Sequence, residues 1–100
     1  MKKIVLICVA GMSTSLLVSH MRDAAKADNY ECEINAYPIA DAPGVIPKAD
    51  IVLLGPQVKY MMNKLKKEYP DKIIEAIDMR VYGMIDGKGA LVQARRCMEE

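Results

Sequence analysis

The sequence predicts an α/β fold of three layers, in which a four-stranded parallel sheet with strand order 2-1-3-4 carries helices on both faces. Two observations lead to this prediction. Residues 3–7 and 51–54 each contain an unbroken apolar run, as in strands that are buried on both faces. Each run is followed by apolar residues at helical spacing, and repeated strand-then-helix units favour a parallel sheet, because each right-handed crossover returns the chain to the same edge.

The first half of the chain is predicted to supply a strand, a helix and an edge strand. Residues 3–7 form the strand, and residues 13–26 form the helix, whose inward positions are Leu17, Met21, Ala24 and Ala25. From residue 32 to residue 39, apolar and polar side chains alternate, which indicates a half-exposed edge strand, and Pro38 limits its further pairing. Residues 41–44, Asp-Ala-Pro-Gly, predict a turn.

The second half repeats this order. Residues 51–54 form a buried strand, and Pro56 opens an amphipathic helix with these inward positions: Val58, Met61, Met62 and Leu65. Residues 73–77 form the last strand, and residues 78–85 are expected to be irregular. Asp86 is predicted to cap a final helix, whose inward positions are Ala90, Leu91, Ala94, Cys97 and Met98.

Length and composition set limits on the function. One hundred residues, 52% of them hydrophobic, predict one compact domain over residues 1–100. A formal charge of +1 supplies no broad surface for nucleic acid or anionic lipid. The apolar run near the N-terminus is too short to span a membrane and lacks the features of a signal peptide, so we expect no membrane insertion.

The cysteines indicate reduced thiols. Cys8, Cys32 and Cys97 form no close pair and no Cys-x-x-Cys motif, so neither a disulfide framework nor a zinc site is suggested. We therefore expect a cytoplasmic protein without a metal. Cys32 and Cys97 fall on core-facing positions of a strand and a helix, and we expect them to be inert.

The segment around Cys8 has the order that a nucleophile within an anion site requires. The cysteine ends the first strand, a small-residue and hydroxyl-rich turn follows, and then the helix begins. Backbone N–H groups and the positive end of the helix dipole would stabilise a thiolate or a phosphoryl group at this place. We predict that Cys8 is the catalytic residue and that the following residues bind phosphate: Val9, Ala10, Gly11, Met12, Ser13, Thr14 and Ser15.

The residues after Cys8 argue against a hydrolase. A cysteine phosphatase of the Cys-x5-Arg type has an arginine six positions after the thiol, where this chain has Thr14. The sequence also has no Asp-Pro general acid. A carrier that passes the phosphoryl group to another molecule fits better than an enzyme that releases it to water.

The loop also carries a family resemblance. Residues 8–15, Cys-Val-Ala-Gly-Met-Ser-Thr-Ser, resemble the active-site loop of the IIB component of the bacterial sugar phosphotransferase system, lactose/cellobiose/chitobiose class. Residues 54–58, Leu-Gly-Pro-Gln-Val, and 82–84, Tyr-Gly-Met, resemble the same family, so the likeness extends over nearly the whole chain. Many relatives have a serine where this chain has Val9, which leaves the backbone donors of the loop unchanged.

The resemblance implies a function and its partners. Cys8 would accept phosphate from a phosphohistidine of the IIA component and pass it to a sugar held by the membrane component IIC. Gln57 and Tyr82 would be accessory residues beside the phosphate. The resemblance implies no cofactor, and its sugars are β-linked disaccharides such as cellobiose, chitobiose or lactose.

Two other functions stay open at this point. A regulatory module would use the phosphorylated or unphosphorylated Cys8 loop to signal to a transcription factor, and a small cysteine phosphatase or arsenate reductase would turn over its substrate alone. Met12 and Tyr60 are candidates for a partner surface, and His20 is expected to have a surface or packing role. Asp78 either binds backbone amides near the crevice or caps a turn.

The oligomeric state is predicted from the lack of an association motif. The sequence shows neither a heptad seam nor an evident long edge strand, so we expect a monomer.

Overall fold

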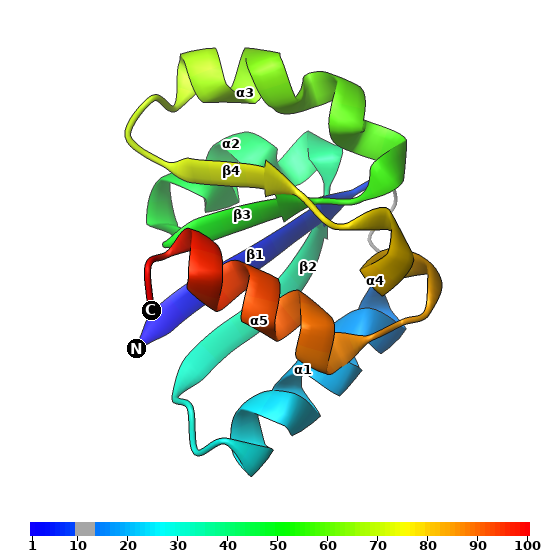
Figure 1. The fold of residues 1–100 in the computed structure, drawn as a ribbon. Helices are drawn as coiled ribbons and strands as arrows, with labels where there is room; N and C mark the ends of the chain where they lie inside the picture. The colour runs from blue at the N-terminus through cyan, green and yellow to red at the C-terminus, as the bar shows by residue number, and fades with distance from the viewer. Residues whose placement is uncertain (10–13) are drawn as a thin grey trace.

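The computed structural model describes residues 1–9 and 14–100 and has the predicted α/β architecture (Figure 1). The strands are β1 (Lys2–Cys8), β2 (Cys32–Pro38), β3 (Ile51–Leu54) and β4 (Ile73–Ala76). The helices are α1 (Ser15–Ala27), α2 (Ala42–Val45), α3 (Met62–Glu68), α4 (Met79–Gly83) and α5 (Gly87–Cys97). Short 3₁₀ segments at Ile39–Asp41 and Ile46–Lys48 flank α2, and another at Pro56–Met61 leads into α3.

The sheet is parallel and has the predicted order. The strands lie in the sequence β2-β1-β3-β4, and every pair is parallel. β1 is therefore a central strand, with Ile4 opposite Ile34 of β2 and Ile51 of β3. The two termini lie at the same end of the molecule, where Lys2 Nζ is 3.7 Å from a carboxylate oxygen of Glu100 (Figure 1).

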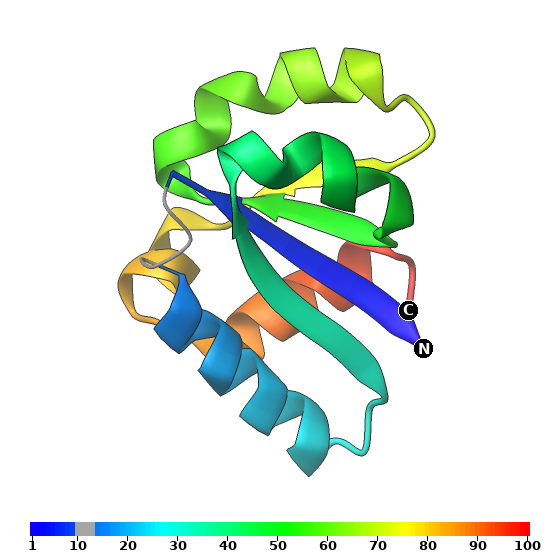
Figure 2. The ribbon, with the colours of Figure 1, turned by 180° about the vertical axis from the view of Figure 1, so that it is seen from behind.

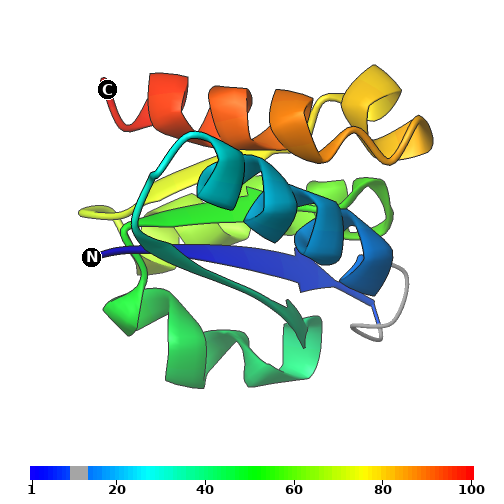
Figure 3. The same cartoon turned by 90° about the horizontal axis from the view of Figure 1, so that it is seen from below.

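The alternation of side chains along β1 and β3 divides the core into two halves. Ile4, Leu6 and Leu53 pack on the face that is covered by α1 and α5. Val5 and Ile7 point to the other face, which α2 and α3 cover (Figures 2 and 3). Because both faces are covered, the central strands are apolar throughout, and this confirms the three-layer prediction.

The predicted helix faces are largely confirmed. Leu17, Met21 and Ala25 of α1 are buried, and so are Ala90, Leu91 and Ala94 of α5. Cys97 and Met98 are partly buried against the same core. The Asp86 carboxylate accepts a hydrogen bond from the Gly89 N–H at 2.9 Å, as predicted for a cap of the last helix.

Two local predictions are wrong. Residues 41–44 do not form a simple turn, because Ala42–Val45 is the helix α2 and places the buried Ala42 against the core. Residues 78–85 are not irregular throughout, because they contain α4. The Asp78 carboxylate accepts hydrogen bonds from the N–H groups of Arg80 and Val81, at 2.9 and 3.1 Å, and this cap supports a helix too short to be stable alone.

The edge strands correct one premise of the monomer prediction. β2 is an edge strand seven residues long, whereas β4, at the opposite edge, has four residues. The sequence had been expected to lack a long edge strand. The oligomeric state itself stays a prediction.

Gly87 fixes how closely α5 approaches α1. A Cβ atom on Gly87 would lie 2.2 Å from the carbonyl carbon of His20 and 2.5 Å from the backbone nitrogen of Met21. We predict that Gly87→Ala lowers the free energy of unfolding by about 2 kcal/mol or more, because the backbone of α1 cannot yield as a flexible side chain would. Gly44→Ala is the matched control, since a Cβ there meets nothing within 4 Å. Urea unfolding that gives equal stabilities for the two variants would contradict this packing.

Candidate active site

The carboxyl ends of the parallel strands meet at one edge of the sheet, and Cys8 lies there. Cys8 is the last residue of β1 and is paired in register with Pro38 of β2. The Gly55 N–H donates to the Ile7 carbonyl at 2.9 Å, and the Ile77 N–H donates to the Leu54 carbonyl at 2.9 Å. The turns after β1, β3 and β4 therefore share this edge, where α/β proteins place their ligands.

Among residues 1–9 and 14–100, two polar groups contact the Cys8 sulfur. The Thr14 hydroxyl donates to Sγ at 3.3 Å, and the thiol donates to the Tyr37 carbonyl at 3.8 Å. Cys8 and Thr14 are both fully buried. Within the described part of the chain, the sulfur thus lies between the Thr14 hydroxyl and the Tyr37 carbonyl.

Thr14 also ties the sulfur to the start of α1. It directly precedes Ser15, the first residue of that thirteen-residue helix, and its carbonyl accepts a hydrogen bond from the Val18 N–H at 2.9 Å. The N-terminal end of α1 is thus within hydrogen-bond distance of Cys8. The positive end of the helix dipole favours a thiolate or a bound anion at this place.

The other residues of the predicted phosphate loop divide into two groups. Val9 is exposed, and Ser15 is exposed at the first position of α1. Ala10, Gly11, Met12 and Ser13 lie outside the described residues. The role of the loop in binding phosphate stays a prediction.

Gln57 lies beside the end of β1. A Cβ atom built on Gly55 would be 3.3 Å from Gln57 Oε1 and 3.7 Å from the Cβ of Cys8. Both side chains therefore border the small space that the glycine leaves open. This places the Gln57 amide close to Cys8, on the side of β3.

The other predicted residues have different surroundings. Tyr82 of α4 is partly buried against the core between α1 and α5. Tyr60 is 77% exposed, as a contact for a partner requires. His20 Nδ1 lies 2.9 Å from the Ile85 carbonyl and joins α1 to the segment before α5, which agrees with the predicted surface or packing role.

Sequence reasoning missed the Tyr37 carbonyl. A main-chain acceptor leaves no signal in residue type, and its position follows only from the register of β1 and β2. Pro38, which ends β2 next to Cys8, was the one visible sign that this strand ends there.

Neither a metal site nor a membrane span is found in the parts of the chain that the structure describes. Within residues 1–9 and 14–100, no group of three His, Cys, Asp or Glu side chains is placed to hold a metal ion. No helix in these ranges combines the length and the apolar character needed to cross a membrane.

Comparison with known proteins identifies the family. The sequence model of the family described as "PTS system, Lactose/Cellobiose specific IIB subunit" matches residues 3–93. The chain belongs to this family. IIB subunits act as phosphotransferases in sugar phosphorylation during uptake, together with IIA and IIC components.

Several bacterial IIB components are similar to the chain over nearly its whole length. The oligo-beta-mannoside-specific EIIB component of Bacillus subtilis is 47% identical over 100 residues, covering 98% of this chain and 97% of the relative. The cellobiose-specific EIIB component of Lactococcus lactis subsp. lactis is 41% identical over 104 residues, covering 97% and 96%. The galactose-specific component of L. lactis subsp. cremoris shows the same identity and coverage.

Solved structures of IIB components have the same fold. The cellobiose-specific IIB component from Borrelia burgdorferi superposes with a TM-score of 0.81 at 33% identity, covering 98% of this chain and 92% of the other. The lactose-specific IIB domain from Streptococcus pneumoniae gives a TM-score of 0.84 at 16% identity, covering 95% of each chain. This second similarity concerns the fold alone.

The hydrogen bond from Thr14 to Cys8 is expected to raise the reactivity of the thiol. A hydroxyl donor stabilises a sulfur anion more than a neutral thiol, by about 1.5 kcal/mol for a bond to a charged group. We predict that Thr14→Val slows alkylation of Cys8 by iodoacetamide about tenfold, while Thr14→Ser, which keeps the hydroxyl, stays near the parent rate. Mass spectrometry of the Cys8 peptide measures both rates. Faster alkylation in the valine variant would contradict this role of the hydroxyl.

The surroundings of Cys32 and Cys97 favour the neutral thiol. Burial raises the pKa of both thiols, with a smaller opposing effect of Arg95 on Cys32, and Glu75 raises the pKa of Cys97 further. A raised pKa means less thiolate at pH 8, so we predict slower alkylation of these cysteines in the folded protein than in urea at that pH. Equal rates in the two states would show that both thiols are as reactive as free cysteine.

Proposed function

We propose that Cys8 is the phosphoryl carrier of this IIB subunit. It accepts the phosphoryl group from a phosphohistidine of the IIA component and passes it to a sugar held by the membrane component IIC. The observation that supports this assignment is the contact of the Cys8 sulfur with the Thr14 hydroxyl, at the N-terminal end of α1. Cys32 and Cys97 lack such a position, and their raised pKa values disfavour the thiolate.

The first transfer exchanges a nitrogen–phosphorus bond for a sulfur–phosphorus bond. The Cys8 sulfur attacks the phosphorus in line with the leaving imidazole nitrogen, the thiol proton departs, and the imidazole gains a proton. In the second transfer a sugar hydroxyl attacks the same phosphorus and loses its proton, and the sulfur leaves as the thiolate. The proton that the sugar hydroxyl loses balances the proton that the thiolate takes up, and the thiol then again donates to the Tyr37 carbonyl.

The residues around the sulfur are proposed to hold the phosphoryl oxygens with neutral donors. These are the backbone N–H groups and hydroxyls of residues 9–15 and the Gln57 amide, with Tyr82 as a further accessory residue. Neutral donors stabilise the transferring group and still allow it to leave, which a relay requires. The transfer requires no metal or other cofactor on this chain.

The proposed substrate is a β-linked disaccharide, such as cellobiose, chitobiose or lactose. Relatives specific for oligo-beta-mannoside and for cellobiose support this class of sugar. We further propose that residues 1–100 act as one IIB domain and that the subunit is a monomer between its encounters with the two partners.

Transfer from phosphorylated IIA tests the assignment. We predict that incubation adds one phosphoryl group to the chain and that Cys8→Ser abolishes the transfer, because serine lacks the nucleophilic thiolate. Cys32→Ser and Cys97→Ser are the matched controls and are expected to accept phosphate as the parent does. Intact mass and site mapping give the result, and a label on any residue other than Cys8 would overturn the proposal.

Sugar uptake separates transport from regulation. Cells whose IIB subunit carries Cys8→Ser are expected to lose uptake of the cognate sugar. Full uptake in these cells would instead favour a regulatory module.

A further inference from the structure

The outer edge of β2 offers backbone groups for pairing with a strand of a second chain. β2 is as long as the central strand β1, with seven residues each, and it has a neighbour on one side only. Edge strands offer unpaired backbone groups to other chains, and short edge strands reduce this hazard. β4 is short, with four residues, but β2 is not.

The opposite edge of the sheet shows how a side chain closes such an edge. Gln93 of α5 donates from Nε2 to the Ala76 carbonyl at 2.8 Å, and its Oε1 accepts a hydrogen bond from the Asp78 N–H at 3.0 Å. The Gln93 amide thus takes the place of a neighbouring strand at the end of β4.

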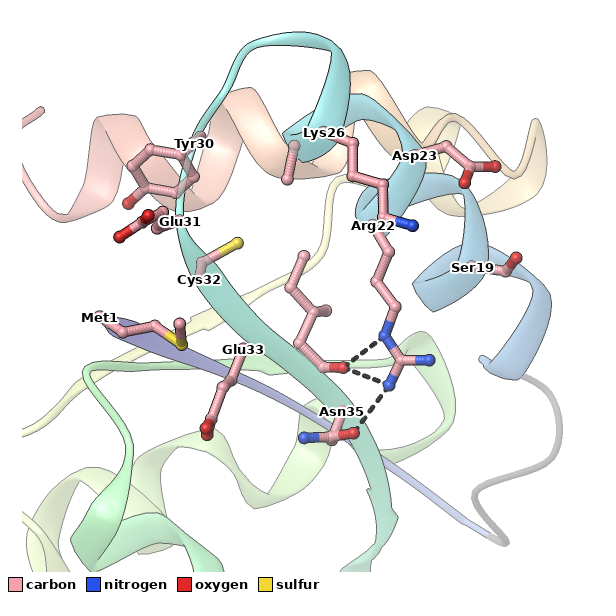
Figure 4. Close-up of a pocket in the computed structure, with 12 residues that line it drawn as sticks. Met1, Ser19, Arg22, Asp23, Lys26, Tyr30, Glu31, Cys32, Glu33 and Asn35 are labelled. Carbon is pink, nitrogen blue, oxygen red and sulfur yellow. Dashed lines mark hydrogen bonds between the residues drawn. The ribbon is translucent and has the colours of Figure 1, made fainter.

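Arg22 of α1 contacts the edge of β2 in a similar way, but near the middle of the strand (Figure 4). Its Nε and Nη2 both donate to the Ile34 carbonyl, at 3.0 and 2.6 Å, and Nη2 also donates to Asn35 Oδ1 at 2.7 Å. Ile34 lies in the middle of β2, so the guanidinium covers the centre of the edge. Three donor contacts from one planar group hold it there in a fixed orientation.

Stability alone gives little reason for this arrangement. Arg22 is largely exposed, and water would satisfy the same carbonyl, so the net gain from the hydrogen bonds is modest. The arginine instead determines which chemical groups approach the edge of β2. A guanidinium has only donors, so the N–H group of an incoming strand meets a cation and finds its acceptor already occupied.

The groove beside the edge has both charged and apolar side chains in its lining. It has a volume of about 660 Å³ and lies between α1 and β2. Charged side chains line it, and besides Arg22 they are Asp23, Lys26, Glu31 and Glu33. The backbone of β2 at the rim of this groove is the part of this face that another strand would use.

We propose that Arg22 guards the edge of β2 against pairing with β2 of a second copy of this chain. The partner strand would be β2 of another copy. A two-fold axis beside the centre of β2 would bring two edges of equal length and sequence together. The guard keeps the chain from forming a continuous sheet across two molecules.

Replacing the guanidinium tests the guard. Arg22→Met keeps an unbranched apolar side chain, shorter than that of arginine, and removes the donors, while Lys26→Met removes a cation that lines the same groove. Sedimentation equilibrium over a range of concentrations is expected to show a dimer for Arg22→Met, and no dimer for the parent chain or for Lys26→Met. Hydrogen exchange is expected to show that backbone amides within residues 32–37 of β2 become more protected as Arg22→Met associates.

Three results would overturn the proposal. They are an Arg22→Met variant that sediments like Lys26→Met, an association that protects a segment other than Cys32–Pro38, and a parent chain that already pairs through this strand. If Arg22→Met does not fold by circular dichroism, Arg22→Gln decides in its place. Glutamine removes the positive charge and the fork of guanidinium donors, so this variant is expected to dimerise, and its failure to associate counts against the proposal.

Discussion

The candidate site depends on one constraint, which is the burial of β1 on both faces. Ile4 and Leu6 pack toward α1 and α5, while Val5 and Ile7 pack toward α2 and α3, so the strand cannot slide by one residue without exchanging the two cores. This fixes where the strand ends. The sulfur of Cys8 is therefore held at the carboxyl edge of the sheet, and the start of α1 reaches it through Thr14.

The same constraint explains what could be predicted from the sequence. Long apolar runs and helical spacing reflect burial, and the strands, the three layers and the inward faces of α1 and α5 follow from burial. Asp86 was predicted to cap a helix because a strongly periodic helix follows it, whereas Asp78 was predicted only to bind backbone amides or cap a turn, since just the five residues of α4 follow it. Both carboxylates accept hydrogen bonds from backbone N–H groups at the start of a helix, but only the helix after Asp86 has a periodic sequence that could be recognised.

What could not be predicted depends on tertiary contacts. Pro43 and Gly44 are typical of a turn, yet the burial of Ala42 holds this segment as a helix. At the site, the cysteine and the hydroxyls are visible in the sequence. The Tyr37 carbonyl contacts Cys8 because of strand register, and the Gln57 amide lies near Cys8 because of the space that Gly55 leaves; the residue types alone indicate neither of these.

The two contacts of the Cys8 sulfur act differently on its two charge states. The Tyr37 carbonyl accepts a hydrogen bond from the thiol, but once the proton has left, the same carbonyl repels the sulfur anion. The Thr14 hydroxyl remains a donor to the anion, as do the N–H groups at a helix N-terminus. Loss of the thiol proton therefore weakens the contact with β2 and strengthens the contact with the start of α1. On the proposed function, the sulfur would thus be drawn toward the phosphate loop when it becomes a nucleophile.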